Sequence, residues 1–244
     1  MQAMTVWLVG SGIVGRRLAR QLAGHEVVEH DPRVEPTPLA SPGDVAVLAH
    51  PVAHAPLARG FALRGASVVT VGDDFDDSAA LLDLAPTFEA RGASLVVGAA
   101  MSPGLSGLLA RHLADQLASV DEIHVAIHGT AGPACARAYH RSLSRRAHGW
   151  HDDEWADYLG GSGRELCWFP EPVGAKDCYR ADFADPYLLH AAFPGVRRIT
   201  ARRSARRRDR FTARLPMLRV PHAEGRIGAL RVEVRGANAG GGRE

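Results

Sequence analysis

The chain has 244 residues, of which 46% are hydrophobic and 23% are charged, and its formal net charge is +2. This balance excludes an intrinsically disordered chain, and it gives no global field that would favour a nucleic-acid or membrane partner. The three cysteines form no CxxC pattern, so neither a disulfide framework nor a metal site is indicated. Because there is no basic leader and no membrane-spanning apolar run, we expect a cytoplasmic protein.

The first hundred residues alternate between strand-like and helix-like segments. Short apolar runs predict strands at residues 5–9, 26–30, 44–50, 66–72 and 94–100. Helical periodicity predicts helices over residues 13–23, 52–64 and 73–91, the last interrupted at Pro86. This alternation predicts an α/β fold with a Rossmann-type, doubly wound parallel sheet.

A further helix is predicted over residues 102–118. Ser102 is expected to cap it and Pro103 to occupy its first position. Its apolar stripe consists of leucines at positions 105, 108, 109, 113 and 117. Residues 122–129 again resemble a strand.

After Gly129 the simple alternation stops, and two extended stretches follow near residues 197–215 and 226–235. We therefore expect a second, smaller α+β domain. The predicted boundaries are residues 1–120 for the Rossmann domain, 121–235 for an α+β substrate or dimerisation domain, and 236–244 for a flexible tail.

A glycine-rich turn lies between the first predicted strand and helix. Gly10-Ser11-Gly12-Ile13-Val14-Gly15 matches GxGxxG. In this pattern the first glycine permits a tight turn, the second lets the backbone approach a pyrophosphate, and the third lets helix pack on strand. The helix N-terminus then presents N–H groups to the phosphates. The alternative is a glycine-rich turn that binds no ligand.

The second predicted strand is followed by an acid. Asp31 comes sixteen residues after Gly15, where a carboxylate can accept hydrogen bonds from adenosine ribose hydroxyls. Arg33 could instead neutralise a 2′-phosphate. The cofactor is therefore NAD or NADP, with NAD favoured. A solvated turn acid before Pro32 is the alternative for Asp31.

Loops at the carboxyl ends of parallel strands form the binding crevice of such a sheet. His50, Pro51 and Ala100 belong to the predicted cofactor set on this ground. Asp73 and Asp74 also follow a strand, but helix capping is favoured over contact with the nicotinamide because acids suit a helix N-terminus.

Three other features are interpreted as structural and not as functional sites. The segment HGWHDDEW, residues 148–155, is interpreted as a surface loop and not as a metal site, and Cys167 as a buried, inert thiol. Arg197–Arg214 contains nine arginines with Phe211 as its aromatic residue, so a solvated strand and hairpin is favoured over RNA binding. An anion site for a substrate carboxylate or cofactor phosphate is the remaining alternative.

Three segments carry a resemblance to a known family: GSGIVGRRLARQL at residues 10–22, SVVTVGDD at 67–74 and LVVGAAMSPGLSGLLARHLA at 95–114. With these segments the chain resembles the saccharopine dehydrogenase-like NAD(P)-binding oxidoreductases. The resemblance implies a Rossmann domain joined to an α+β domain whose sheet mediates homodimerisation. It also implies that the residues Met101, Ser102, Pro103 and Gly104 form a loop near the nicotinamide. The chain departs from the family pattern in two places: the region between the second and third strands is short, and so is the stretch after Arg235.

The resemblance implies hydride transfer at an amino, imino or carbonyl carbon of a small, carboxylate-bearing substrate. Among His128, His140, Lys176 and Tyr179, the residues His128 and Lys176 are predicted to transfer protons. The alternative is a catalytically inactive dinucleotide-binding module, acting as a redox sensor or an assembly subunit. The short C-terminal stretch favours this alternative.

Overall fold

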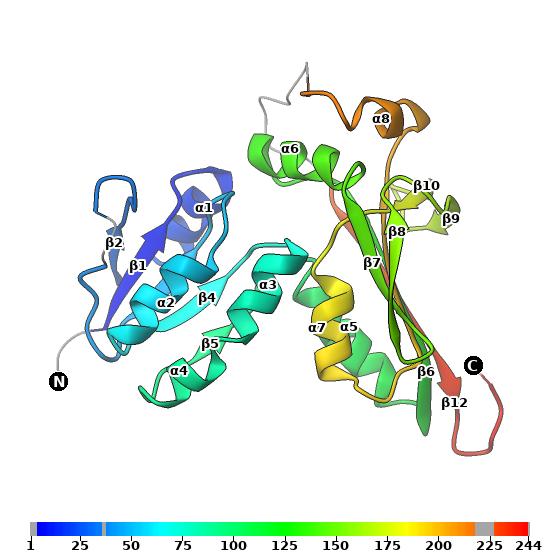
Figure 1. The fold of residues 1–244 in the computed structure, drawn as a ribbon, viewed down its shortest axis with the longest axis horizontal. Helices are drawn as coiled ribbons and strands as arrows, with labels where there is room; N and C mark the ends of the chain where they lie inside the picture. Colours follow the sequence, from blue (N-terminus) through cyan, green and yellow to red (C-terminus); the bar gives the residue numbers. More distant parts are fainter. Residues whose placement is uncertain (1–3, 36–37, 218–226, 244) are drawn as a thin grey trace. The chain divides into compact units, whose positions relative to one another are not determined.

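A computed structural model describes residues 4–35, 38–217 and 227–243 (Figure 1). The chain forms two compact units, Met1–Ala100 and Met101–Glu244. The sequence places this boundary near residue 120. It lies earlier because helix α5 (Leu105–Ala114) contributes Ala110 and Ala114 to the core of the second unit, which is therefore the longer one. In the described part of the chain, no helix is long and apolar enough to cross a membrane.

The described residues of the first unit contain a five-stranded parallel sheet with the order β2-β1-β3-β4-β5. The strands are β1 (Thr5–Val9), β2 (Glu26–Glu29), β3 (Val45–Leu48), β4 (Ser67–Thr70) and β5 (Leu95–Val96). The strand order reverses between β1 and β3. The predicted doubly wound parallel sheet is confirmed, and the carboxyl ends of β1 and β3 are its expected ligand-binding point.

Helices alternate with these strands, as the sequence predicts. They are α1 (Ile13–Gln21), α2 (Ala55–Leu63), α3 (Phe75–Leu82) and α4 (Ala85–Glu89). The predicted interruption at Pro86 is confirmed, because this proline lies in the first turn of α4. The core contains fully buried side chains from strands and helices, among them Leu48, Phe61, Val68 and Leu81.

A buried carboxylate fixes the start of the sheet. Asp44 precedes β3, and its oxygens accept hydrogen bonds from Thr5 N and Trp7 Nε1, each at 3.0 Å, and from Ser41 N at 2.8 Å. These donors satisfy a carboxylate that is 7% exposed, and they hold its pKa below the usual value despite burial. The beginnings of β1 and β3 are thereby tied together.

The second unit is built on a seven-stranded mixed sheet in its described part. Its main path has the order β12-β6-β11-β10-β9, and the hairpin β7-β8 joins it through β11. The strands are β6 (Ser119–His128), β7 (Arg146–His151), β8 (Glu154–Leu159), β9 (Glu165–Trp168), β10 (Ala175–Arg180), β11 (Arg198–Ser204) and β12 (Ala229–Ala237).

The apolar face of this sheet packs against α5 and α7 (Asp185–Ala192). Ile123, Val125 and Ile127 of β6 lie in this core with Ile199 of β11. Since successive side chains of a strand point to opposite faces, His124 and His128 lie on the other face. The unit also contains α6 (Pro133–Ser142) and α8 (Arg207–Thr212).

The prediction for the start of α5 is wrong. The helix begins at Leu105 after Gly104 and has no side-chain cap, because Ser102 Oγ instead donates to Asp185 Oδ2 at 2.6 Å. The buried face is Ser106, Ala110 and Ala114, at a spacing of four. Leu105 and Leu108 of the predicted stripe are exposed. The small residues allow α5 to lie close to its neighbours.

The solvated strand and hairpin predicted over Arg197–Arg214 is also wrong. β11 is an interior strand, parallel to β6, and the chain then forms α8. Arginines are tolerated there because each finds a partner: Arg202 bonds Glu165 Oε2 and Thr200 Oγ1, both at 3.0 Å. The guanidinium of Arg203 lies 3.9 Å from the centroid of the Tyr139 ring.

Two segments expected to be irregular are ordered. HGWHDDEW forms the β7-β8 hairpin, in which Asp152 and Asp153 have positive φ values of 46° and 66°, as a two-residue hairpin turn requires. In the predicted tail, Gly236 and Ala237 belong to β12. Asn238 Oδ1 then accepts from the N–H groups of residues 240 and 242, which closes a turn.

Candidate functional site

The glycine turn at the end of β1 is shaped by the protein's own backbone at two positions. Gly10 has φ of 123°, and a Cβ there would lie 2.5 Å from the carbonyl oxygen of Ala49. A Cβ on Gly15 would lie 1.6 Å from the carbonyl oxygen of Gly10. No larger residue fits at either position without movement of the main chain.

Gly12 differs from these two glycines because the space beside it is empty. No heavy atom of the described residues lies within 4 Å of a Cβ added at Gly12. Gly12 is the N-cap of α1, the helix has no side-chain cap, and its first turn has no acid. The N–H groups and the positive dipole end of α1 therefore point to open space, an arrangement that favours an anion. Ser11 and Gly12 are exposed, so the space is accessible, whereas Ile13 and Val14 are partly covered in the first turn.

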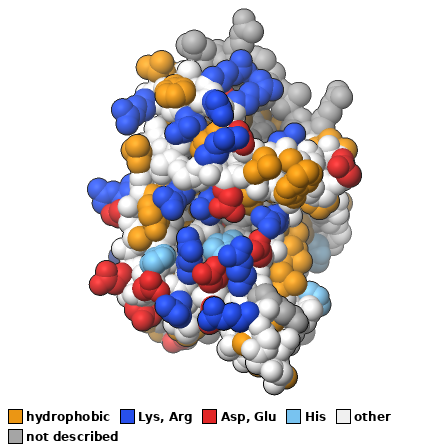
Figure 2. All heavy atoms as spheres, turned by 90° about the vertical axis from the view of Figure 1, so that its right-hand side faces the viewer, with side chains coloured by type: hydrophobic (Ala, Val, Ile, Leu, Met, Phe, Trp, Pro, Cys, Tyr) orange, Lys and Arg blue, Asp and Glu red, His pale blue; other side chains and the backbone are white. Residues whose placement is uncertain are grey.

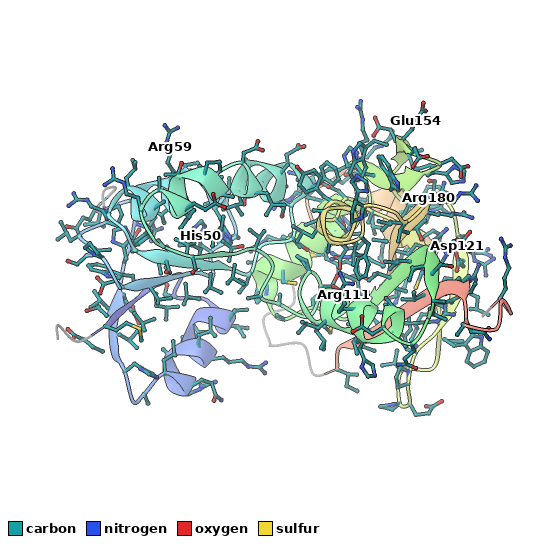
Figure 3. The ribbon with its side chains drawn as sticks, turned by 90° about the horizontal axis from the view of Figure 1, so that it is seen from below. His50, Arg59, Arg111, Asp121, Glu154 and Arg180 are labelled. Carbon is teal, nitrogen blue, oxygen red and sulfur yellow. The ribbon has the colours of Figure 1, made fainter. Side chains whose placement is uncertain are left out.

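His50 follows β3 beside this turn. Its backbone nitrogen would lie 3.0 Å from a Cβ on Gly10, and Figure 3 shows the side chain within the fold, in contrast to Arg59, which points outward. The His50 and His54 rings lie 4.4 Å apart between centroids. Burial, followed by the charge of His54, lowers the pKa of His50 to about 4, so the ring is neutral at pH 7. Pro51 is exposed next to it.

Asp31 and Arg33 form an ion pair after β2. The guanidinium donates from Nε to Oδ1 at 2.9 Å and from Nη2 to Oδ2 at 2.7 Å. The hydrogen bonds from Arg33 lower the pKa of Asp31 to about 2. Both side chains are accessible, so the pair can exchange its partners for a ligand. A ribose diol would compete with Arg33 for the carboxylate.

Two of the acids after β4, Asp74 and Asp77, have structural roles. Asp74 is the N-cap of α3, and its Oδ1 accepts from Asp77 N at 3.0 Å. Asp77 in turn accepts from His54 N and Ala55 N, which fixes the start of α2. Capping, the interpretation favoured from the sequence, is confirmed for Asp74. Asp73 precedes the cap.

The predicted loop near the nicotinamide lies where the two units meet in the chain. Ala100 ends the first unit, and Met101 packs against the core of the second. Pro103 is buried, and Gly104 has φ of 134° before α5. This loop is anchored by Ser102 on Asp185, a carboxylate that is 1% exposed.

A polar group lies where β6 and β11 end. These strands are parallel and pair Ile127 with Arg203, so His128 and Ser204 are the next residues of each. His128 Nδ1 lies 2.7 Å from Ser204 Oγ, which lies 3.2 Å from Tyr139 Oη. Burial and the positive charge of Lys176 lower the pKa of His128. His128 and Lys176, the two residues that the sequence predicts for proton transfer, thus interact electrostatically.

The other two candidates for proton transfer have structural positions. His140 is buried, and its Nε2 lies 2.9 Å from the carbonyl oxygen of Thr212. Tyr179 is fully buried on the core face, with the guanidinium of Arg210 lying 4.6 Å from its ring centroid. Sequence reasoning missed Tyr139 and Ser204, because no local pattern reports that β6 and β11 pair.

On the face drawn in Figure 2, many Lys, Arg, Asp and Glu side chains lie close to one another. At the opposite end of β6 and β11 from His128 lies a cavity of about 520 Å³. Its charged lining residues are Asp121, Glu122, His151, Asp152, Arg197, Arg198, Arg235 and Arg243. Its arginines pair with its acids, for example Arg197 with Asp152 at 3.0 Å. Cys167 is buried beside Cys178, as expected for an inert thiol.

Comparison with known proteins supports the fold. No protein-family model and no curated protein sequence matches the chain. It is similar in structure to apo saccharopine dehydrogenase (L-Glu forming) from Saccharomyces cerevisiae, with 17% identity and a TM-score of 0.55. The likeness covers 82% of this chain and 54% of that chain, so the chain spans about half the length of this protein. The fold expected from the resemblance, a Rossmann-type sheet with a second α+β unit, is confirmed.

Two weaker likenesses are to proteins solved with nicotinamide cofactors. GenD2 from gentamicin A biosynthesis, solved with NAD, has 17% identity and a TM-score of 0.44 over 100% of this chain and 72% of that one. The WlbA dehydrogenase from Bordetella pertussis, solved with NADH and UDP-GlcNAcA, has 12% identity and a TM-score of 0.39 over 84% and 71%.

Proposed function

We propose that the chain is an NAD(P)-dependent oxidoreductase of the saccharopine dehydrogenase type. The reaction is hydride transfer at an amino, imino or carbonyl carbon of a small substrate that carries a carboxylate. The observation that carries this proposal is the empty, accessible space at Gly12, directly before the uncapped N-terminus of α1. The dianionic pyrophosphate of a dinucleotide matches the positive dipole end and the free N–H groups of this helix.

The chain's own residues have separate roles in this proposal. When bound, the nicotinamide supplies or accepts the hydride. Main-chain N–H groups of Gly12 and the first turn of α1 bind the pyrophosphate, and Asp31 orients the ribose. His128 holds a proton at the ring nitrogen that does not face Ser204. Lys176 is close enough for its charge to lower the pKa of His128, and its ammonium binds the substrate carboxylate.

Binding and turnover are tested separately. Fluorescence titration with NADH measures binding to the full chain, and nicotinamide absorbance measures hydride transfer with a panel of amino acids and oxo acids plus ammonia. Saturable binding with turnover of at least one carboxylate substrate supports the proposal. Binding without turnover supports a catalytically inactive module instead. A chain that binds neither NADH nor NADPH contradicts both functions.

The proposed cofactor preference is NAD, with only a small margin over NADP. The support is the Asp31–Arg33 pair, which presents an acceptor for ribose hydroxyls and a guanidinium for a 2′-phosphate at one position. Paired titrations with NADH and NADPH measure this margin.

We also propose that the chain forms a homodimer through the second unit. An apolar hollow of about 430 Å³ lies there, lined among others by Leu109, Leu113, Trp168 and Val232. Trp168, which lines this hollow, is 67% exposed, and exposed apolar residues that gather in one place favour a protein–protein interface. Light scattering after size exclusion measures the mass, and Trp168→Arg is expected to shift a dimer to monomer.

A further inference from the structure

Ser204 joins the phenol of Tyr139 to the imidazole of His128. Its Oγ lies 2.7 Å from His128 Nδ1 and 3.2 Å from Tyr139 Oη. A serine hydroxyl has one proton, so it can donate to only one of these neighbours. The direction of this chain of hydrogen bonds decides which ring nitrogen of neutral His128 carries the proton.

The environment of Tyr139 sets that direction. Burial raises the pKa of Tyr139, so the phenol keeps its proton. Ser204 Oγ is the hydrogen-bond partner that the described residues offer to this hydroxyl, and a buried donor left without an acceptor costs about 1–3 kcal/mol. The phenol therefore donates to Ser204. Ser204 in turn donates to His128 Nδ1, which must then be unprotonated.

We propose that Ser204 and Tyr139 are positioning residues that hold neutral His128 in the tautomer protonated on Nε2. His128 then presents a neutral N–H donor from Nε2. Titratable groups on neighbouring elements act on these residues electrostatically: Lys176 of β10 acts on His128, while Arg203 of β11, Asp209 of α8 and Cys178 of β10 act on Tyr139. Protonation of His128 would require Nδ1 to donate to Ser204 and would reverse the hydrogen bonds.

This tautomer determines which atom of His128 can donate a hydrogen bond to the substrate in the proposed reaction. The role toward substrate rests on the proposed function, whereas the tautomer itself does not. In reduction of a carbonyl or imino carbon, the Nε2–H of His128 donates a hydrogen bond to the substrate oxygen or nitrogen as the hydride arrives. Solvent supplies the proton that the product keeps, so His128, Ser204 and Tyr139 each retain their own proton.

The ring nitrogens of His128 report the tautomer directly by NMR of the full chain containing isotope-labelled histidine. His128→Gln identifies the signal by its loss. The wild type is expected to be protonated on Nε2, Ser204→Ala to give a mixture of tautomers, and Ser204→Thr, which keeps the hydroxyl, to restore the wild-type state. Ser142→Ala is a matched control, because Ser142 is another buried serine of this unit and bonds to the carbonyl oxygen of Tyr139.

A second variant tests the same proposal if Ser204→Ala does not fold. Tyr139→Phe removes the donor to Ser204 and leaves β11 unchanged, and it is also expected to mix the tautomers. A wild-type ring protonated on Nδ1 overturns the proposal. So does a tautomer that stays unchanged in the folded variants that lack either hydroxyl.

Kinetics separate this inference from the proposed function. Ser204→Ala is expected to lower kcat for reduction about tenfold or more while KM changes little, with Ser204→Thr near wild type. If the expected tautomer is found and no substrate is turned over, the proposed function fails and the positioning role stands. If turnover is found with the other tautomer, the positioning role fails alone.

Discussion

Replacement of Gly12 by aspartate separates ligand binding from folding. A side chain at Gly12 meets no heavy atom of the described residues within 4 Å, and the residue has an ordinary extended conformation with φ of −73°. Aspartate is a good N-cap and is favourable beside the dipole of α1, so Gly12→Asp is expected to keep the stability within about 0.5 kcal/mol. The new carboxylate, however, occupies the space proposed for the pyrophosphate.

The loss of affinity follows from the charge alone. A unit charge about 4 Å from a phosphate charge costs about 1 kcal/mol in water and about 4 kcal/mol at an effective dielectric constant of about 20. Since about 1.4 kcal/mol is a factor of ten, NADH affinity is expected to fall by about fivefold to several hundredfold. Steric overlap adds to this loss. NADH fluorescence titration measures the affinity, and thermal unfolding measures the stability.

Two further glycines provide the controls. A Cβ at Gly24 also meets nothing within 4 Å, so Gly24→Asp adds the same charge away from the turn and is expected to bind NADH as the wild type does. Gly15→Ala places a Cβ 1.6 Å from the carbonyl oxygen of Gly10, and is expected to cost about 3 kcal/mol or more in stability. Wild-type affinity in folded Gly12→Asp would refute the phosphate site, and wild-type stability of Gly15→Ala would refute the turn geometry.

Other variants test single contacts. Asp31→Ala releases the guanidinium of Arg33, so the affinity for NADPH relative to NADH is expected to rise roughly tenfold in paired titrations, and an unchanged ratio contradicts this role. Ser106→Ala removes a 2.5 Å hydrogen bond to the buried carboxylate of Asp185, and urea unfolding should show a loss of about 1.5–3 kcal/mol. The folded-state pKa of His50, about 4, lies below the unfolded value of about 6.5. The unfolded chain therefore binds the additional proton between these pH values, and stability falls as pH falls through that window. His50→Leu should reduce that loss by about 1–2 kcal/mol between pH 7 and pH 4, and equal pH dependence of variant and wild type speaks against the assignment.

The sequence by itself determined the first unit and its glycine turn. Strands at the predicted positions follow from short apolar runs, and helices from a period near four, because both signals are local. The roles of Gly10 and Gly15 could also be predicted from the sequence, since a strand, a turn and a helix that are adjacent in sequence must pack closely. Capping by Asp74 is a local interaction of the same kind.

Only the tertiary structure decided the second unit. His128 and Ser204 are 76 residues apart and meet because β6 and β11 pair in parallel. Arg203 is buried because the ring of Tyr139 from α6 lies against it, whereas charge alone predicts a solvated segment. Ser102 leaves its expected cap for Asp185, 83 residues away. In each case the partner is distant in the chain, so local sequence patterns do not indicate it. The tertiary contact then outweighs the local preference that the sequence does indicate.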